Sequence, residues 1–254
     1  MRTLSKSPDE SPHVDSLYTR RINHLMKNWP ARDIRYLEIG VERGHTFESV
    51  RAGEKVGVDP SPKFNVQELP EGAEFFSQES DDFFSGFAGA KFDVVFVDGL
   101  HEAHQTYRDI IHAFANMKKG SVCVVDDVWP TDYASSLPSP RSSTRAKKLR
   151  RIRHRRWYGD VYRAICAISE CNPEIGIKIV GDPKVSHSWA ILYAKEAAGL
   201  VSTSAHAEET MTNLSFKKVF RTERPNSPYN QIMTDSDFFS FNSLEALCSE
   251  SAPE

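Results

Sequence analysis

Short apolar runs alternate with amphipathic stretches along most of the chain, and this alternation constrains the fold more than any other feature of the sequence. YLEIGV (36–41), FDVVFVDG (92–99) and SVCVVDDV (121–128) have the length and the β-branched content of buried strands. AHQTYRDIIHAFANM (103–117) places its apolar side chains on one helical face, and KKG after it is typical of a helix end. Such a pattern predicts an α/β fold, with a mostly parallel sheet covered on both faces.

Weaker patterns fill the gaps between these elements. We expect helices at 17–29, 45–51, 80–88 and 157–170, the third of them capped by Ser80 or Asp81, and strands at 55–60 and 73–78. Two last strands, 175–182 and 188–195, are separated by a short loop. This spacing predicts an antiparallel hairpin at one edge of the sheet.

Composition divides the chain into regions. Residues 1–15 are rich in Ser and Pro and are expected to be a disordered tail. Residues 16–198 form the predicted domain, interrupted by a basic insertion or lid at 129–156. Residues 199–254 are a Ser-rich extension in which no domain can be recognised.

Charge and cysteine content exclude several classes of protein. The net charge is −3, which gives no overall field toward nucleic acid or membranes. No apolar run approaches the roughly 20 residues that cross a bilayer, and the N-terminus lacks the apolar core of a signal peptide. The four cysteines show no metal-ligand spacing. These features predict a cytoplasmic protein with reduced thiols.

The ends of the first two predicted strands carry a candidate ligand site. The carboxyl end of the first strand delivers Glu38, Gly40 and Gly44, and Asp59 comes 19 residues after Gly40, where a carboxylate can accept hydrogen bonds from ribose hydroxyls. A dinucleotide loop would have a third glycine, and Glu38 would repel a diphosphate. An ammonium, a sulfonium and a ribose, as in S-adenosylmethionine, suit this acidic loop better.

With these residues in place, the chain resembles a known family. LEIGVERG, GVDP, SDDFF, FDVVFVDGLH, KKGSVCVVDDV and WYGDVYRAI, within residues 33–195, are similar to class I S-adenosylmethionine-dependent methyltransferases, and in particular to the sugar and small-molecule O-methyltransferases of the macrocin O-methyltransferase type. The resemblance implies a Rossmann-like, doubly wound sheet of strand order 3-2-1-4-5-7-6 with strand 7 antiparallel. It also implies that Glu38, Gly40 and Gly44 line the methionine part of the cofactor, that Asp59 holds the ribose, and that Glu79 and Ser80 lie beside the adenine.

Three further carboxylates follow the fourth and fifth strands. The implied strand order makes these strands neighbours, so Asp98, Asp126 and Asp127 would converge, and Asp98 would also border the cofactor. Three carboxylates so close together need a cation, and a hard divalent metal such as Mg²⁺ prefers oxygen ligands. Related metal-dependent enzymes carry D-x-x-H and D-D at these two places. The alternative is that the carboxylates cap helices or face solvent.

His101, three residues after Asp98, is the candidate general base, because an imidazole can accept a proton from an acidified hydroxyl near neutral pH. His104 lies one turn further on and is interpreted as a surface histidine. Trp157 is expected to pack the insertion onto the core and is given no chemical role.

The insertion carries nine Lys and Arg between Arg141 and Arg156. A charge run of this kind is usually a solvated surface or a mobile lid. It could instead cover the active site and select an anionic acceptor. Nucleic-acid binding is the third reading, and no aromatic residues are interleaved to support it.

The sequence therefore predicts a cytoplasmic, Mg²⁺-assisted, S-adenosylmethionine-dependent O-methyltransferase acting on a small hydroxylated molecule such as a sugar or natural product. Two alternative functions stay open: a nicotinamide-dependent oxidoreductase, and a non-catalytic module that binds a cofactor or nucleic acid. The oligomeric state, a homo-oligomer included, also stays open.

Overall fold

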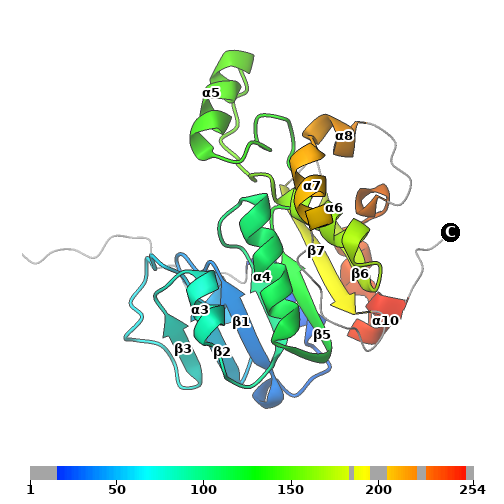
Figure 1. The fold of residues 1–254 in the computed structure, drawn as a ribbon. Helices are drawn as coiled ribbons and strands as arrows, with labels where there is room; N and C mark the ends of the chain where they lie inside the picture. Colours follow the sequence, from blue (N-terminus) through cyan, green and yellow to red (C-terminus); the bar gives the residue numbers. More distant parts are fainter. Residues whose placement is uncertain (1–15, 183–185, 195–204, 222–226, 250–254) are drawn as a thin grey trace, which may run out of the picture.

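The computed structural model describes residues 16–182, 186–194, 205–221 and 227–249. Its centre is an eight-stranded sheet of order β3-β2-β1-β4-β5-β7-β6-β8 (Figure 1). The strands are β1 (Arg35–Ile39), β2 (Glu54–Val58), β3 (Ala73–Phe76), β4 (Phe92–Val97), β5 (Met117–Val125), β6 (Ile175–Asp182), β7 (Ser186–Ala194) and β8 (Ile232–Met233). Strand β7 pairs antiparallel with β5 and β6, and the other pairings are parallel. The predicted fold class and strand order are confirmed, with β8 added beyond β6.

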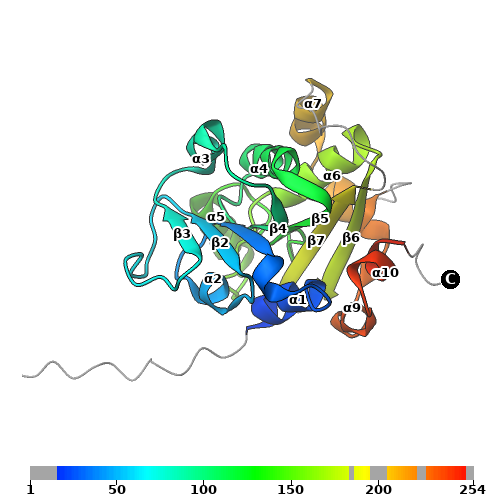
Figure 2. The same ribbon diagram turned by 90° about the horizontal axis from the view of Figure 1, so that it is seen from below.

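Helices cover both faces of the sheet (Figure 2). One face is covered by α3 (Ser80–Gly86), α4 (Ala103–Ala115), α6 (Val161–Cys171), α7 (Ala205–Asn213) and α8 (Phe216–Phe220). The other is covered by α1 (Leu17–Leu25), α2 (His45–Ser49), α9 (Asp235–Ser240) and α10 (Leu244–Ser249). The strands alternate their side chains between two buried clusters, which explains why their sequences are almost continuously apolar.

The C-terminal extension is part of this domain and not a separate one. Met211 and Phe216 pack with α4 and α6 on one face, whereas Phe238 and Leu247 lie in the core on the opposite face. Strand β8 pairs with β6. No pattern in the sequence indicated this, because each segment is short and supplies only a few apolar side chains to a core formed mainly by other elements. The predicted tail at 1–15 lies outside the described residues.

The structure corrects the expected end of one helix and the expected cap of another. Helix α4 ends at Ala115, and Met117 already belongs to β5, so the segment KKG is part of a strand. The register shifts between Phe92, which pairs with Met117, and Val94, which pairs with Val122, and this irregularity accommodates the exposed residues 118–120. Helix α3 is also not capped by a side chain of Ser80 or Asp81. Glu79 is its cap residue, without a side-chain hydrogen bond.

The basic insertion is folded. It contains α5 (Pro140–Arg150), which projects beyond the edge of the sheet (Figure 1). Ser139 caps α5, and the indole of Trp157 donates a hydrogen bond to the carbonyl of Leu137. Nowhere in the described parts of the chain is a helix long and apolar enough to span a membrane.

Candidate active site

A pocket of about 520 Å³ lies at the carboxyl ends of β1, β2 and β4. Such a position is where open α/β sheets bind ligands. Its lining includes five carboxylate residues, namely Glu42, Asp59, Glu79, Asp98 and Asp109. Lys63 is the only Lys or Arg among the described residues that line it, and its ammonium is paired with Glu42. The pocket is therefore strongly acidic.

The tip of β1 is shaped by residues with a positive φ. Gly40 has a φ of +84°, and a Cβ at this position would lie 2.1 Å from the carbonyl oxygen of Asp98. Only glycine therefore lets the β1 and β4 tips approach each other. Gly40 lines the pocket as predicted. Gly44, also at positive φ, precedes α2 and packs beside Phe64, outside the pocket lining.

Glu38 does not line the pocket. It lies on the sheet face covered by α1 and α2, where it is 2% exposed and accepts a hydrogen bond of 2.6 Å from the Tyr36 hydroxyl. Burial raises its pKa to about 8, although Tyr36 and Lys55 oppose the shift. Side chains two residues apart share one face of a strand, which explains why Glu38 follows Tyr36 away from the pocket. Its assignment to the cofactor stays a prediction.

Asp59 ends β2 and is held rigidly. Its Oδ2 accepts a hydrogen bond of 2.8 Å from the backbone N–H of Glu42, and its Oδ1 one of 2.7 Å from the N–H of Ser61. The residue is 9% exposed and lines the pocket. The carboxylate is thus fixed where it can accept further hydrogen bonds from a ligand.

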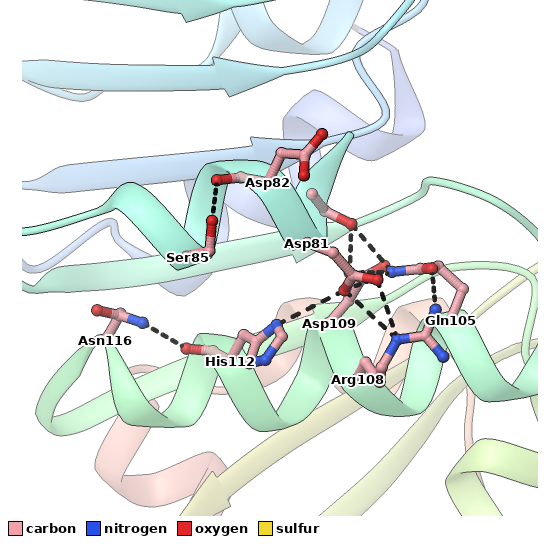
Figure 3. Close-up of polar contacts among 9 residues, drawn as sticks. Asp81, Asp82, Ser85, Gln105, Arg108, Asp109, His112 and Asn116 are labelled. Carbon is pink, nitrogen blue, oxygen red and sulfur yellow. Dashed lines mark hydrogen bonds and ion pairs between the residues drawn. The ribbon is translucent and has the colours of Figure 1, made fainter. Parts of the chain in front are cut away.

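The wall between α3 and α4 contains a polar network that the sequence analysis missed in part (Figure 3). Ser80 donates a hydrogen bond of 2.6 Å to Asp109 Oδ1, and Gln105 Nε2 donates to the same oxygen at 3.1 Å. Burial raises the pKa of Asp109 to about 6, against these two hydrogen bonds. Glu79 and Ser80 line the pocket here as predicted, together with Gln105 and Asp109. The sequence could have indicated Gln105 and Asp109, because these two polar residues are four positions apart on the helical face that also carries Ala113.

The predicted carboxylates converge where β4 and β5 end. His101 Nδ1 lies 2.9 Å from Asp127 Oδ2, and His101 Nε2 lies 3.8 Å from Asp98 Oδ1. Asp126 is 4% exposed, and its Oδ1 has no hydrogen-bond partner among the described residues. Asp127 has a φ of 57°, a sparsely populated conformation for a residue other than glycine.

The charges in this group oppose one another. Burial and the negative charges of Asp126 and Asp127 raise the pKa of Asp98, and burial and Asp127 raise that of Asp126. Burial by itself would lower the pKa of His101, but the hydrogen bond and charge of Asp127 outweigh it and the pKa is raised. The group therefore has an excess of negative charge that His101 only partly balances.

The segment that follows the insertion supports His101 directly. The rings of His101 and Trp157 have centroids 5.1 Å apart. The backbone N–H of Asp160 donates to the carbonyl of His101 at 3.3 Å, and Gly159, with a φ of 63°, packs against the same carbonyl. His104 instead pairs with Glu208 of α7 at 2.8 Å and does not line the pocket.

Two residues beside the carboxylates were not anticipated. Tyr18 of α1 shares a hydrogen bond of 2.7 Å with His187 of β7, and its pKa is raised by burial and by the charge of Asp126. Among the charges that act on His187 are those of Asp127 and of Arg156, in the insertion. Their sequence positions gave no signal, because α1 and β7 meet β5 only in the folded chain.

A metal ion bound by the three aspartates would be consistent with their charge, but their side chains do not form a ready-made metal site. No group of three or more His, Cys, Asp or Glu side chains within the described ranges is arranged to hold a metal ion. The observations that fit a cation are the unpartnered, buried Asp126 Oδ1 and the raised pKa values of Asp98 and Asp126, to both of which the charge of Asp127 contributes. A small cavity of about 10 Å³ is lined by Asp98, His101 and Asp126.

The chain is similar to several known proteins. Residues 37–128 match a family model described as a methyltransferase domain. Cofactor-bound Rv0187 from MTB is 18% identical, with a TM-score of 0.50 over 74% of this chain and 84% of that one. An O-methyltransferase from Bacillus cereus in complex with SAH is 16% identical, with a TM-score of 0.49 over 73% and 84%. MycE methyltransferase from the mycinamycin biosynthetic pathway, in complex with Mg, SAH and mycinamycin VI, is 16% identical, with a TM-score of 0.46 over 73% and 52%. No curated protein matches the sequence.

The matched domain and the strand order define the class of this protein: residues 37–128 match a methyltransferase domain, and the sheet has the Rossmann-like methyltransferase fold. The matched segment runs from β1 to just beyond β5 and contains Asp59, Asp98, Asp126 and Asp127. The predicted enzyme class is confirmed. The macrocin-type branch stays a prediction.

Proposed function

We propose that the protein is an S-adenosylmethionine-dependent O-methyltransferase that acts on a small hydroxylated acceptor. The observation that carries this proposal is the acidic pocket that opens beside His101, Asp98 and Asp127. A pocket with five carboxylate residues and one paired lysine suits a ligand with cationic centres and hydroxyls. It is unfavourable for the diphosphate of a nicotinamide dinucleotide.

The residues present fit the cofactor by their chemistry. Asp59 would accept hydrogen bonds from the ribose hydroxyls, since its carboxylate is already oriented by two backbone N–H groups. Gly40 would allow close approach of the methionine part, and Glu79 and Ser80 would border the base. When bound, the cofactor would supply a methyl group on a sulfonium sulfur, which an oxygen nucleophile would attack in line with S-adenosylhomocysteine as the leaving group.

His101 would accept the proton of the acceptor hydroxyl. Its Nδ1 is held by Asp127, and this contact fixes the ring while Nε2 faces Asp98. Trp157 limits rotation of the ring from the other side. The arrangement corresponds to a histidine base oriented by a carboxylate.

We further propose that Asp98, Asp126 and Asp127 bind a divalent metal, with Mg²⁺ as the candidate. A bound cation would satisfy Asp126 Oδ1 and offset the repulsion among the three carboxylates. Such a cation would orient the acceptor hydroxyl and lower the pKa of that hydroxyl.

The acceptor is proposed to be anionic because of the insertion. Arg150 lies over the ring of Tyr133, and Lys147 is 7% exposed and binds the carbonyl of Arg156, so these two cations have structural partners. Arg156 is among the charges that lower the pKa of His187, and Asp127 is among those that raise it, so a cation of the insertion and a carboxylate of the group act on the same histidine. An acceptor with a carboxylate or phosphate would be attracted there.

Calorimetry and an acceptor screen would test the proposal. S-adenosylhomocysteine should bind at least a hundredfold more tightly than NAD, about 2.8 kcal/mol. Asp59→Asn should weaken its binding by about 1–3 kcal/mol. Release of S-adenosylhomocysteine from S-adenosylmethionine should then be measured with sugars and phenols, each with and without a carboxylate or phosphate. Comparable affinity for NAD, or no affinity for S-adenosylhomocysteine, would contradict the proposal.

A further inference from the structure

The basic insertion concentrates positive charge in one part of the chain. No acidic residue occurs between Asp132 and Asp160, and the whole chain nevertheless has a net charge of −3. The exposed cations of this segment are Arg141, Arg145, Lys148, Arg150, Arg151, Arg153, Arg155 and Arg156. The overall charge therefore conceals a local positive surface, which attracts anions at short range.

These cations are not neutralised within the described parts of the chain. The two acidic residues that bracket the insertion have other partners: Asp132 pairs with His154 at 2.7 Å, and Asp160 pairs with Arg163 at 3.3 Å. None of the ion pairs among the described residues includes an exposed Lys or Arg of the insertion. The positive surface is therefore available to a partner.

Helix α5 presents part of this charge as an ordered row. Arg141, Arg145 and Lys148 are spaced by four and three positions, so their side chains share one face of the helix. Ser143 and Lys147 are buried and lie on the face toward the domain. Since α5 projects beyond the edge of the sheet (Figure 1), its outer face can reach a flat surface that the rest of the domain cannot.

Three large hydrophobic side chains are exposed within the described residues, and two of them belong to the insertion. They are Leu149, Leu100 and Tyr133, with exposed fractions of 84%, 58% and 42%. The guanidinium carbon of Arg150 lies 4.7 Å from the centre of the Tyr133 ring, so Tyr133 borders α5 close to Leu149. Apolar side chains and cations are therefore exposed together.

The segment that follows the insertion connects it to the pocket. The backbone N–H of Tyr158 donates to the carbonyl of Ser135, in the insertion, at 3.0 Å. The backbone N–H of Asp160 donates to the carbonyl of His101, next to Leu100, which lines the pocket. The insertion itself follows the end of β5. The cations, the exposed apolar side chains and the pocket thus lie at the same edge of the sheet.

This combination fits an anionic phospholipid surface. Cations near such a surface are attracted by its negative potential, and exposed apolar side chains enter the boundary between headgroups and acyl chains. A nucleic acid would bind the cations but leave Leu149 in water, and the insertion lacks interleaved aromatic residues for stacking. The lipid surface accounts for both kinds of exposed side chain.

We propose that the outer face of α5, with Leu149, docks the protein reversibly on an anionic phospholipid surface, and that the pocket lies at the edge of the sheet nearest to the lipid. Docking needs only the insertion, so the inference does not depend on the proposed function. It assigns a partner to cations that the proposed acceptor site, which uses Arg156, does not require.

Flotation with lipid vesicles would test the charge contribution. The wild type should float with vesicles of phosphatidylserine and phosphatidylcholine in equal parts, and not with phosphatidylcholine alone. The double variant Arg145→Gln, Lys148→Gln should partition about 25-fold more weakly, because each cation near the surface contributes about a factor of five. The matched control is Lys91→Gln, Lys119→Gln, which removes two exposed cations near the N-terminal ends of β4 and β5. This control should partition as the wild type does.

Leu149→Gln would separate a lipid surface from other polyanions. Burial of a large apolar side chain predicts that this variant binds the mixed vesicles about tenfold more weakly, with an unchanged dependence on salt. Melting curves should show that each variant is folded. Polyglutamate and a DNA duplex are the competing probes, measured by fluorescence anisotropy.

Three results would overturn the proposal. The first is a wild type that does not float with the mixed vesicles. The second is equal flotation of the α5 double variant and its lysine control. The third is vesicle binding that is insensitive to Leu149→Gln while polyglutamate or the duplex binds at least as tightly, which would assign the surface to an acidic protein or a nucleic acid. Binding of S-adenosylhomocysteine, measured separately, would leave the proposed function standing in each case.

Discussion

His101 Nδ1 lies 2.9 Å from Asp127 Oδ2, so the carboxylate that follows β5 holds the histidine that follows β4. The contact joins two strand ends that are adjacent in the sheet and 26 positions apart in the chain, from 101 to 127. It orients the imidazole beside the pocket. Substitutions of single residues can therefore test the proposed chemistry.

Replacing His101 by Ala should lower kcat for methyl transfer by about 10²–10⁴, the usual range for loss of a general base. Affinity for S-adenosylhomocysteine, measured by calorimetry, should change little, because Asp59 and Gly40 are untouched. His104→Ala is the control, since His104 pairs with Glu208 outside the pocket. Equal loss of activity in the two variants would contradict a specific role for His101.

The metal proposal predicts that EDTA abolishes methyl transfer and that Mg²⁺ restores it. Asp126→Asn should lose Mg²⁺ affinity, measured by calorimetry with the metal alone, together with activity, because one charge is removed from the group. The control is Asp93→Asn, which makes the same charge change at the N-terminal end of β4, where Asp93 pairs with Lys118. This variant should bind the metal as the wild type does. Full turnover in EDTA would rule the metal out.

Gly40→Ala should destabilise the protein by about 2–4 kcal/mol and abolish binding of S-adenosylhomocysteine. The added Cβ would lie 2.1 Å from the Asp98 carbonyl, in a backbone conformation of positive φ. Gly86→Ala, at the end of α3, has nothing within 4 Å of the added Cβ and should be neutral or slightly stabilising. Chemical denaturation of both variants would measure the difference. A fully stable Gly40→Ala variant that binds normally would show that the tips of β1 and β4 can separate.

Asp109 should make stability depend on pH in a defined direction. Its pKa is raised to about 6 in the folded state from 3.8, so the ionised carboxyl costs stability above pH 6 and this cost disappears below about pH 4. The difference of about two pKa units corresponds to about 3 kcal/mol. The neighbouring charges are Asp81, which raises the pKa, and Arg108, which lowers it.

Relative to the wild type, Asp109→Asn should therefore become more stable as pH rises from about 4 to 6, and the difference should then level off. Urea unfolding at several pH values would measure it. Asp82→Asn is the matched control, because it removes the same charge from an exposed side chain of the neighbouring helix α3. A difference for Asp109→Asn that does not change with pH would contradict the raised pKa of Asp109.

If the insertion attracts an anionic acceptor, Arg156→Glu should raise KM for that acceptor about tenfold with little change in kcat. The effect should shrink as salt rises through about 0.1–0.5 M, because exposed charges are screened. Lys119→Glu makes the same charge change on an exposed residue near the start of β5 and should have no effect. If KM does not change with salt or with the Arg156→Glu substitution, the insertion is a solvated surface that does not attract the acceptor.

The sequence by itself determined the architecture. Apolar runs such as FDVVFV can be buried on two faces only in a covered sheet, and the short loop before β7 indicated the antiparallel edge. The sequence also placed Asp59, Asp98, Asp126 and Asp127 at strand ends, because a parallel sheet brings the carboxyl ends of its strands to one side. These features are local, or they follow from strand order alone.

The tertiary structure decided which side chains meet. Glu38 lies near the carboxyl end of β1, where the motif requires it, yet the pleat turns it toward Tyr36 and away from the pocket. Tyr18, His187 and Asp109 enter the site from α1, β7 and α4, and each reaches it through packing between elements that are distant in sequence. The extension likewise has too few apolar residues to specify a fold, and it gains one only by burying them against helices and strands formed earlier in the chain. Side-chain direction and long-range packing depend on the whole assembled core, which a pattern read along the chain does not contain.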